Sequence, residues 1–296
     1  MKKVFLSFAD SALRPSAKRI LQQAKKLEVY DRIIVADEHD LEKSFRKKFK
    51  SKLVAGSRGY GYWAWKPQII LQTLRKMENG DVLQYTDVGC HLNPKGNWRL
   101  LEYFSLTDKS NSGILAFQAK APELPLPYDG RQLFDLPDFQ WIKGDLLDYF
   151  HIRNDESIIK AQTIGATIIF IKKTADSLRL VKEWCAVADF DFSLIDDSPS
   201  KSPNLPGFIE HRHDQAIFSL LCKINKVETL SAFEYWYPSS SDYETPDWEM
   251  LEKFPIHVKR DKVFLPENMF VERITRKVSS LLNRITRSAK ANPDDF

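Results

Sequence analysis

The feature that most constrains the fold is an alternation of short apolar runs with longer segments that carry apolar residues at helical spacing. The runs that read as strands are KVFLSF (3–8), RIIVAD (32–37), VLQYTD (82–87), GILAFQ (113–118) and ATIIFIK (166–172). Helical patterns occupy residues 11–29, 66–78, 140–150, 174–188 and 213–224. Strands that alternate with helices predict an α/β fold built on a mainly parallel sheet.

The length and the cysteines exclude several classes of protein. A chain of 296 residues with 43% hydrophobic residues can bury a sizeable core. Cys90, Cys185 and Cys222 are far apart and form no CxxC pair, which argues against a disulfide framework or a thiolate metal cluster. The first apolar run, about five residues long, is too short for a signal peptide, and no run approaches the ~18 residues of a membrane span. We therefore expect a cytoplasmic protein.

A carboxylate closes the apolar run VLQYTD, and a glycine follows two residues later. Parallel sheets bind ligands beyond the carboxyl ends of their strands, where we expect Asp87 to lie. Asp87 with Gly89 could form a simple turn, because both residue types are common there. Asp87 could instead hold Mg²⁺ or Mn²⁺ that bridges a diphosphate, with Gly89 allowing close approach to the backbone.

The segment HRHDQAIFSLL (211–221) opens a helix with two histidines and an acid. Asp214 could stabilise the first helical turn through its free N–H groups and the helix dipole. Alternatively, His211 or His213 contacts a metal ion or a phosphate, and Asp214 is a base or a sugar-binding carboxylate. The HxHD pattern also occurs in metal-dependent phosphoesterases, but their further clusters of His and Asp are absent from this sequence.

Aromatic residues are unusually dense in RGYGYWAWKPQ (58–68), which contains Tyr60, Tyr62, Trp63 and Trp65. Such rings can stack on bases or sugar faces, while the cations at positions 58 and 66 neutralise phosphate. The alternative is an aromatic plug in the core at the start of a helix. In QTIGATIIF (162–170), the glycine before the strand permits close approach of a ligand or marks a bulge.

Together and in this order, these segments resemble nucleotide-sugar glycosyltransferases of the GT-A type. VLQYTDVGC resembles the DxD motif of that fold in a shortened form, QTIGATIIF its N-x-G strand, and HRHDQAIFSLL its DQ-containing helix. FPIHVKRDK (254–262) resembles the late segment in which a histidine completes the metal site and a lysine holds the diphosphate. The YW-x-WKP run is similar to small bacterial glycosyltransferases of surface-polysaccharide gene clusters. The resemblance covers residues 1–262.

The resemblance implies roles for particular residues. Asp87 would bind the divalent cation, with His211 or His257 as a further ligand. Asp214 and Gln215 would be catalytic: Asp214 as base in an inverting enzyme, or either residue positioning the sugar in a retaining one. The donor-binding residues would be Phe8, Ala9, Asp10, Arg58, Tyr62, Trp65, Lys66, Asp87, Gly89, Gln162, Gly165 and His213. The implied cofactor is Mn²⁺ or Mg²⁺, and the sequence departs from the family pattern in that Gly89 stands in place of the second acid of DxD.

The implied activity is transfer of a hexosyl unit from a nucleotide-diphosphate sugar, a UDP-sugar, to a glycan or lipid-linked acceptor in bacterial surface-polysaccharide (capsule or lipopolysaccharide) synthesis. The predicted domain is 1–265, followed by a basic amphipathic helix at 266–296. That helix could bind the inner face of the cytoplasmic membrane, dock on its own domain or form a dimer.

Two other functions remain compatible with the sequence. One is nucleic-acid binding through the basic clusters, KSFRKKFKSK (43–52) among them, and the aromatic loop, although the net charge of +4 is too mild to indicate it alone. It would also leave Asp87 and HRHDQ unexplained, so no nucleic acid is expected. The other is a sugar-nucleotide-binding relative that has lost catalysis.

Overall fold

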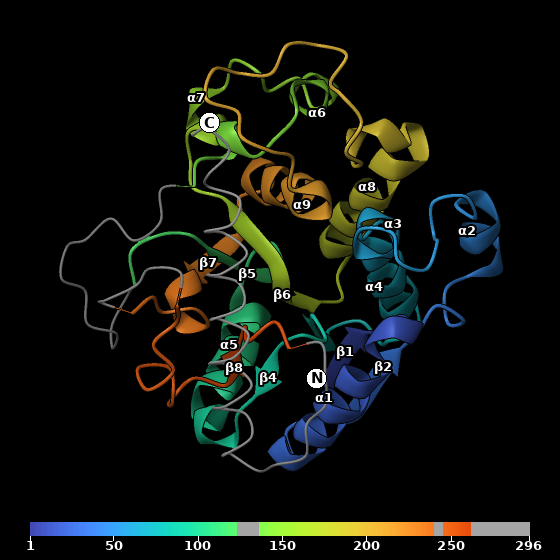
Figure 1. Ribbon diagram of the computed structural model, residues 1–296. Coiled ribbons are helices and arrows are strands. Elements are labelled where there is room, and N and C mark those ends of the chain that lie inside the picture. Colours follow the sequence, from blue (N-terminus) through green and yellow to red (C-terminus); the bar gives the residue numbers. More distant parts are fainter. Residues whose placement is uncertain (123–135, 240–244, 262–296) are drawn as a thin grey trace, which may run out of the picture. The chain divides into compact units, whose positions relative to one another are not determined.

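The computed structural model describes residues 1–122, 136–239 and 245–261, and its centre is a six-stranded sheet of order β2-β1-β3-β6-β5-β7 (Figure 1). The strands are β1 (Lys3–Phe8), β2 (Arg32–Ala36), β3 (Val82–Thr86), β5 (Ile114–Gln118), β6 (Ile164–Lys172) and β7 (Glu228–Ser231). β1 is parallel to β2 and β3, and β5 is parallel to β7, whereas β6 is antiparallel to both β3 and β5. The predicted α/β fold with a mainly parallel sheet is confirmed.

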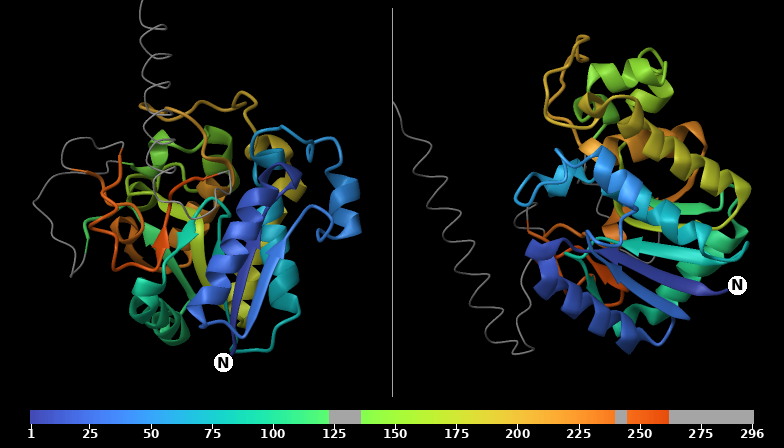
Figure 2. Two further views of the ribbon diagram at one scale, coloured as in Figure 1. Left: turned by 60° about the horizontal axis from the view of Figure 1, so that its bottom comes forward. Right: turned by 90° about the vertical axis from the view of Figure 1, so that its right-hand side faces the viewer.

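Helices cover both faces of the sheet because successive side chains of a strand point to opposite sides (Figure 2). Val4 and Leu6 of β1 pack in the core shared with α4, α8 and α9, while Phe5 packs in the core shared with α1 and α5. The helices are α1 (Arg14–Leu27), α2 (Lys43–Lys48), α3 (Gly59–Tyr62), α4 (Trp65–Arg75), α5 (Asn97–Lys109), α6 (Gly144–Tyr149), α7 (Glu156–Ile159), α8 (Ala175–Phe190) and α9 (His213–Ile224). Five short 3-10 helices complete the described elements: Ser11–Leu13, Pro94–Gly96, Asp138–Gln140, Phe192–Leu194 and Ala232–Glu234.

A small second sheet brings a late segment of the chain to the end of β3. Strand β4 (His91–Leu92) pairs antiparallel with β8 (Ile256–His257). The backbone N–H of Asp261 then donates to the carbonyl of Gly89 over 3.0 Å. Residues 256–261 therefore lie against the loop that follows β3, which is where the sequence predicts a ligand.

The helical patterns mark the observed helices closely, with local differences. Residues 11–13 form a 3-10 turn before α1, because Pro15 lies in the first turn of the α-helix. Helix α5 was not predicted, since Trp98 and Leu101 are exposed apolar residues that blur its buried stripe. The predicted helix at 266–296 lies outside the described residues. Within the described part of the chain, no helix is long and apolar enough to cross a membrane.

Candidate functional site

A cavity of about 480 Å³, which we name the β3 cavity, lies at the carboxyl ends of β1 and β3. Asp87 and Gly89 enter it from the end of β3, and Phe8 and Asp10 from the end of β1. This is the edge at which parallel strands present ligand groups. The volume is within the usual range of small-molecule sites, about 300–1,000 Å³.

Aromatic side chains form one wall of the β3 cavity. Phe8 stacks on Trp65 with ring centroids 3.9 Å apart and planes at 21°. The indole N–H of Trp65 donates to the carbonyl of Gly59 over 3.0 Å, so the loop and the helix start are tied together. Tyr60 and Trp63 also line the cavity and have positive φ angles of 50° and 58°. Non-glycine residues rarely adopt this conformation, and such strain concentrates at ligand sites.

A buried lysine joins two carboxylates beneath this wall. Lys66, at the start of α4, is 3% exposed. Its Nζ lies 2.8 Å from Asp214 Oδ2 and 3.3 Å from Asp87 Oδ1, and it donates to the carbonyl of Ala166 over 3.2 Å. Burial alone would lower the pKa of Lys66, but the two carboxylates outweigh it and raise that pKa. Burial raises the pKa of Asp214 to about 6, and Lys66 opposes a larger rise.

The two carboxylates differ in access. The side chain of Asp87 is 31% exposed and lines the β3 cavity, while its Oδ1 accepts a 2.7 Å hydrogen bond from the hydroxyl of Tyr85. The side chain of Asp214 is 7% exposed and lines neither this cavity nor a second one that lies along β6. A ligand in the β3 cavity can therefore contact Asp87 directly. Asp214 can affect such a ligand only through its ion pair with Lys66.

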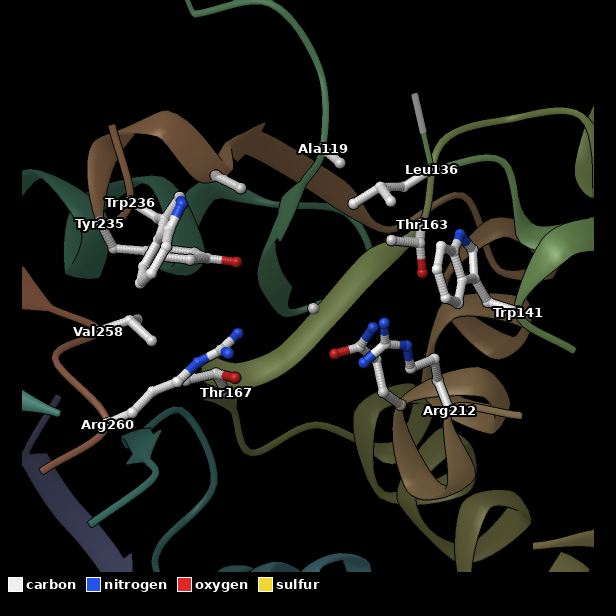
Figure 3. A pocket seen from close by; sticks show the side chains of 13 residues that line it. Ala119, Leu136, Trp141, Thr163, Thr167, Arg212, Tyr235, Trp236, Val258 and Arg260 are labelled. Carbon is white, nitrogen blue, oxygen red and sulfur yellow. The ribbon is translucent and has the colours of Figure 1, made fainter. Parts of the chain in front are cut away.

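A second cavity of about 190 Å³, which we name the β6 cavity, adjoins the first (Figure 3). It is lined by Thr163, which directly precedes β6, by Gly165 and Thr167 of β6, and by Gln215 of α9. A Cβ on Gly165 would lie 2.9 Å from the hydroxyl oxygen of Tyr235, so glycine leaves room for that hydroxyl at the cavity wall. The two cavities share three residues: Thr167, Val258 and Arg260.

Many of the predicted site residues come together here. Phe8, Asp10, Trp65, Asp87 and Gly89 line the β3 cavity. Gly165 and Gln215 line the β6 cavity, and Lys66 contacts Asp87. Ala9 is buried beside them, with its N–H donated to the carbonyl of Ala36 over 2.9 Å.

Arg58 and Gln162 have structural partners outside both cavities. Arg58, predicted as a phosphate contact, forms an ion pair with Asp197 over 3.0 Å. Gln162, predicted in the sugar pocket, accepts a 2.6 Å hydrogen bond at Oε1 from the N–H of Leu136. Neither residue is among those that line the cavities.

His213 and Tyr62 pack against each other instead of facing a donor. Their ring centroids are 5.1 Å apart, and His213 Nδ1 lies 2.7 Å from the carbonyl oxygen of Ile195. Trp63 covers the imidazole on a further side, with a centroid distance of 5.6 Å. Burial lowers the pKa of His213. Tyr62 and Trp63 therefore pack as an aromatic plug in the core, which was the alternative to ligand stacking in the sequence analysis.

The predicted metal ligands His211 and His257 do not join Asp87. His211 is 5% exposed; its Nε2 lies 2.9 Å from the carbonyl oxygen of Leu194, and its Nδ1 accepts from the N–H of Lys143 over 3.4 Å. Burial lowers the pKa of His211 to about 3. His257 Nε2 lies 2.7 Å from the carbonyl oxygen of Leu251, and burial lowers its pKa to about 4.

A ring nitrogen of each imidazole is held by a backbone carbonyl, so neither histidine is shown as the second ligand that the resemblance implied beside Asp87. Among the residues that the structure describes, no group of three or more His, Cys, Asp or Glu side chains could hold a metal ion. Of the three predicted metal ligands, Asp87 is the one among the described lining residues of the β3 cavity.

The basic cluster at 43–52 is partly neutralised within the fold. Lys48 pairs with Asp189 over 2.6 Å, and Lys52 pairs with Asp196 over 3.3 Å. Helix α2 carries part of the cluster and buries none of its own residues. The arrangement favours a solvated helix face rather than a surface for nucleic acid.

The sequence interpretation missed several lining residues of the β6 cavity. Trp141, Tyr235 and Trp236 lie in irregular segments whose sequence carries no motif, so only their aromatic character could have drawn attention. Arg212 lies inside the HRHDQ motif, in which we assigned roles to the neighbouring histidines and not to the arginine. Arg260 lies inside the segment FPIHVKRDK (254–262), where the resemblance gave roles to a histidine and a lysine only.

Comparison with known proteins finds only a distant likeness of overall structure. No known family and no curated protein matches the sequence. Among solved structures, a glycosyltransferase involved in the glycosylation of the major capsid of PBCV-1 is similar with 10% identity and a TM-score of 0.41, over 92% of this chain and 97% of that one. Mouse xyloside xylosyltransferase 1 is similar with 10% identity and a TM-score of 0.41, over 79% and 87%.

A third similar structure is of another class. It is 4-diphosphocytidyl-2C-methyl-D-erythritol synthase from Anaerococcus prevotii, with 11% identity and a TM-score of 0.33, over 78% of this chain and 86% of that one. Similarities of this size do not assign an activity, so the function has to be argued from the two cavities.

Proposed function

We propose that the chain is a GT-A type glycosyltransferase that moves a hexosyl unit from a nucleotide-diphosphate sugar, a UDP-sugar, to a glycan or lipid-linked acceptor. The observation that carries this proposal is the pair of cavities joined at Thr167, Val258 and Arg260. A transfer between two substrates needs two binding sites whose reacting atoms meet, and holding them together supplies much of the rate. The larger cavity would take the donor and the smaller one the acceptor.

The walls of the β3 cavity suit the parts of a nucleotide. The Phe8–Trp65 stack and Tyr60 offer ring faces for a base. Asp10 offers a carboxylate oxygen for ribose hydroxyls. The diphosphate would lie beside Gly89, which lines the cavity. The lack of a side chain there also lets the Arg260 backbone pack closely, since a Cβ on Gly89 would lie 3.3 Å from the Arg260 Cα.

The chemistry requires positive charge at the leaving group. Breaking the bond between the anomeric carbon and phosphate develops negative charge on the diphosphate. Arg260 borders both cavities and can neutralise that charge. A divalent cation that enters with the diphosphate would take Asp87 and phosphate oxygens as ligands, since such ions need only one or two protein carboxylates, and it would supply further charge stabilisation.

At the junction we assign different roles to the predicted catalytic pair. Gln215 lines the β6 cavity and can hydrogen-bond a sugar there. Asp214 lines neither cavity, so we propose that it is a positioning residue that holds Lys66 beside Asp87. This role differs from the general base expected from the sequence, because a base must reach the acceptor hydroxyl.

The cellular setting is proposed from the sequence. The basic amphipathic pattern of residues 266–296 supports a protein at the cytoplasmic face of the inner membrane, where lipid-linked acceptors of surface polysaccharides are found.

The proposal is tested by thermal unfolding with UDP, GDP, CDP or ADP, each with and without Mn²⁺. A nucleotide at about a hundred times its Kd adds ~2.7 kcal/mol to the free energy of unfolding. For a domain of this size we expect the Tm to rise by roughly 5–10 °C with UDP. Asp87→Asn should lose the part of the shift that needs Mn²⁺, while Asp176→Asn, an exposed acid on α8, should keep it. If no nucleotide raises the Tm, the proposed function is wrong.

A further inference from the structure

The β6 cavity holds two arginines that face each other across strand β6. Figure 3 shows Arg212 and Arg260 extending toward one another from opposite walls, with Thr167 beside Arg260. Each guanidinium lies over its own indole: Arg212 Cζ is 4.4 Å from the Trp141 ring centroid, and Arg260 Cζ is 5.3 Å from that of Trp236. Stacking on an aromatic ring holds a guanidinium plane in place and leaves its N–H groups free to bind at the edge.

The backbone fixes these arginines from the two sides. The N–H of Arg212 donates to the carbonyl of Trp141 over 3.0 Å, just before helix α9 begins. Arg260 has a φ of 55°, and the hydrogen bond from Asp261 to Gly89 anchors the chain beside it. A side chain kept on a strained backbone position indicates that its placement matters.

The charged side chains among the described residues that line the β6 cavity are both positive. No acidic residue is found among the described residues that line it, whereas Asp10, Asp87 and Asp261 line the β3 cavity. Arg212 has one acidic partner outside the cavity, Glu210 at 3.0 Å. Burial lowers the pKa of Arg212, and Arg260 contributes to that effect by repulsion. An anion between the two guanidiniums would relieve this repulsion.

We propose that the β6 cavity binds a sugar that carries an anionic group, a carboxylate or a phosphate, and that Arg212 and Arg260 hold this group. Both groups match the planar fork of N–H donors that a guanidinium presents. The cavity volume of about 190 Å³ is that of roughly six water molecules, which suits one sugar unit. The proposal takes from the proposed function only that this cavity holds the acceptor.

The test follows the indole N–H resonances of Trp141 and Trp236 in the full-length chain during titration with glucuronate, glucose 6-phosphate and neutral glucose at constant ionic strength. We expect saturable shifts with the two acids and none with glucose; a preference between the acids distinguishes carboxylate from phosphate. Arg212→Gln should raise the Kd of the bound acid by about tenfold to a hundredfold, as expected for loss of a charge-assisted hydrogen bond. Arg179→Gln, an exposed arginine on α8, should leave the Kd unchanged.

Three outcomes would overturn the proposal: equal shifts with glucose, no shift with either acid, or acid binding that Arg212→Gln leaves intact. UDP is titrated in parallel and followed at Trp63 and Trp65, which line the β3 cavity. If UDP alone moves Trp141 and Trp236, the arginines belong to the donor site. If UDP moves Trp63 and Trp65 but the acids do not bind, the proposed function stands and this inference fails. If the acids bind and UDP does not, this inference stands and the proposed function fails.

Discussion

Replacing Lys66 with methionine should destabilise the protein strongly, although the two side chains have similar length. Lys66 is buried and lies 2.8 Å from Asp214 and 3.3 Å from Asp87. Without the ammonium group, the buried carboxylate of Asp214 has no cation beside it. Removing one partner of a buried ion pair costs about 3–5 kcal/mol, because the remaining charge is desolvated without compensation. We expect the Tm of Lys66→Met to fall by roughly 10 °C.

A double-variant cycle with Asp214→Asn separates this cause from simple loss of packing. If the cost of Lys66→Met comes from an uncompensated charge, then the double variant Lys66→Met/Asp214→Asn should recover at least about 2 kcal/mol relative to the sum of the single costs. Lys160→Met is the matched control, because Lys160 and Glu156 form an exposed ion pair on the surface. Such pairs contribute about 0.3–0.5 kcal/mol.

The pH dependence gives a second check on Lys66→Met. The pKa of Asp214 is already raised to about 6 beside Lys66, and loss of the ammonium group raises it further. Protonation removes the uncompensated charge, so the deficit of Lys66→Met relative to the native protein should shrink as the pH falls from 8 to 5. Denaturant unfolding at several pH values measures this. Strictly additive costs, or a deficit that does not depend on pH, would refute the reasoning.

Two further predictions concern stability. The pKa of Asp214 is raised from 3.8 to about 6 in the folded protein, so protonation stabilises the fold; this stabilisation is complete below pH 3.8 and is lost as the pH rises through about 6. Asp214→Asn should lack that increment, on the order of 2 kcal/mol, in unfolding curves recorded between pH 4.5 and 7.5, and a parallel pH profile would contradict it. Gly96→Ala should lower the Tm sharply or abolish folding, because its Cβ would lie 2.2 Å from the backbone N of Pro255, which cannot move aside. Gly80→Ala, where φ is +87° and nothing lies within 4 Å, should cost only about 1–2 kcal/mol from backbone strain.

The sheet and the β3 cavity could be predicted because their signals are local. β-Branched and aromatic runs mark β1, β3 and β6, and the carboxylate that closes VLQYTD lies where parallel strands present ligands. Trp65 and Lys66 follow glycines in a dense aromatic segment, which indicated both stacking and charge. Strand β7 was missed because ETLS is short and half polar.

The β6 cavity could not be predicted because it is assembled from distant segments. Trp141, Arg212, Trp236 and Arg260 become neighbours only through the tertiary fold, and no spacing in the sequence links them. The prediction of metal ligands among the histidines failed for a related reason. A histidine in a sequence motif does not indicate whether its ring nitrogens face a ligand or a backbone carbonyl. For example, His211 Nε2 is hydrogen-bonded to the carbonyl oxygen of Leu194, and burial lowers the pKa of His211 so that the neutral ring is favoured.

The order in which the chain is made bears on when the protein can act. The six-stranded sheet is complete at Ser231, where β7 ends, yet both cavities depend on residues that follow it. Val258 and Arg260 close the junction between the cavities, and β8 brings them there by pairing with β4. The ribosome therefore adds the residues that close this junction only after it has made every strand of the six-stranded sheet. A protease cut before β8 would leave all six of those strands in one fragment and would separate from it a wall of both cavities.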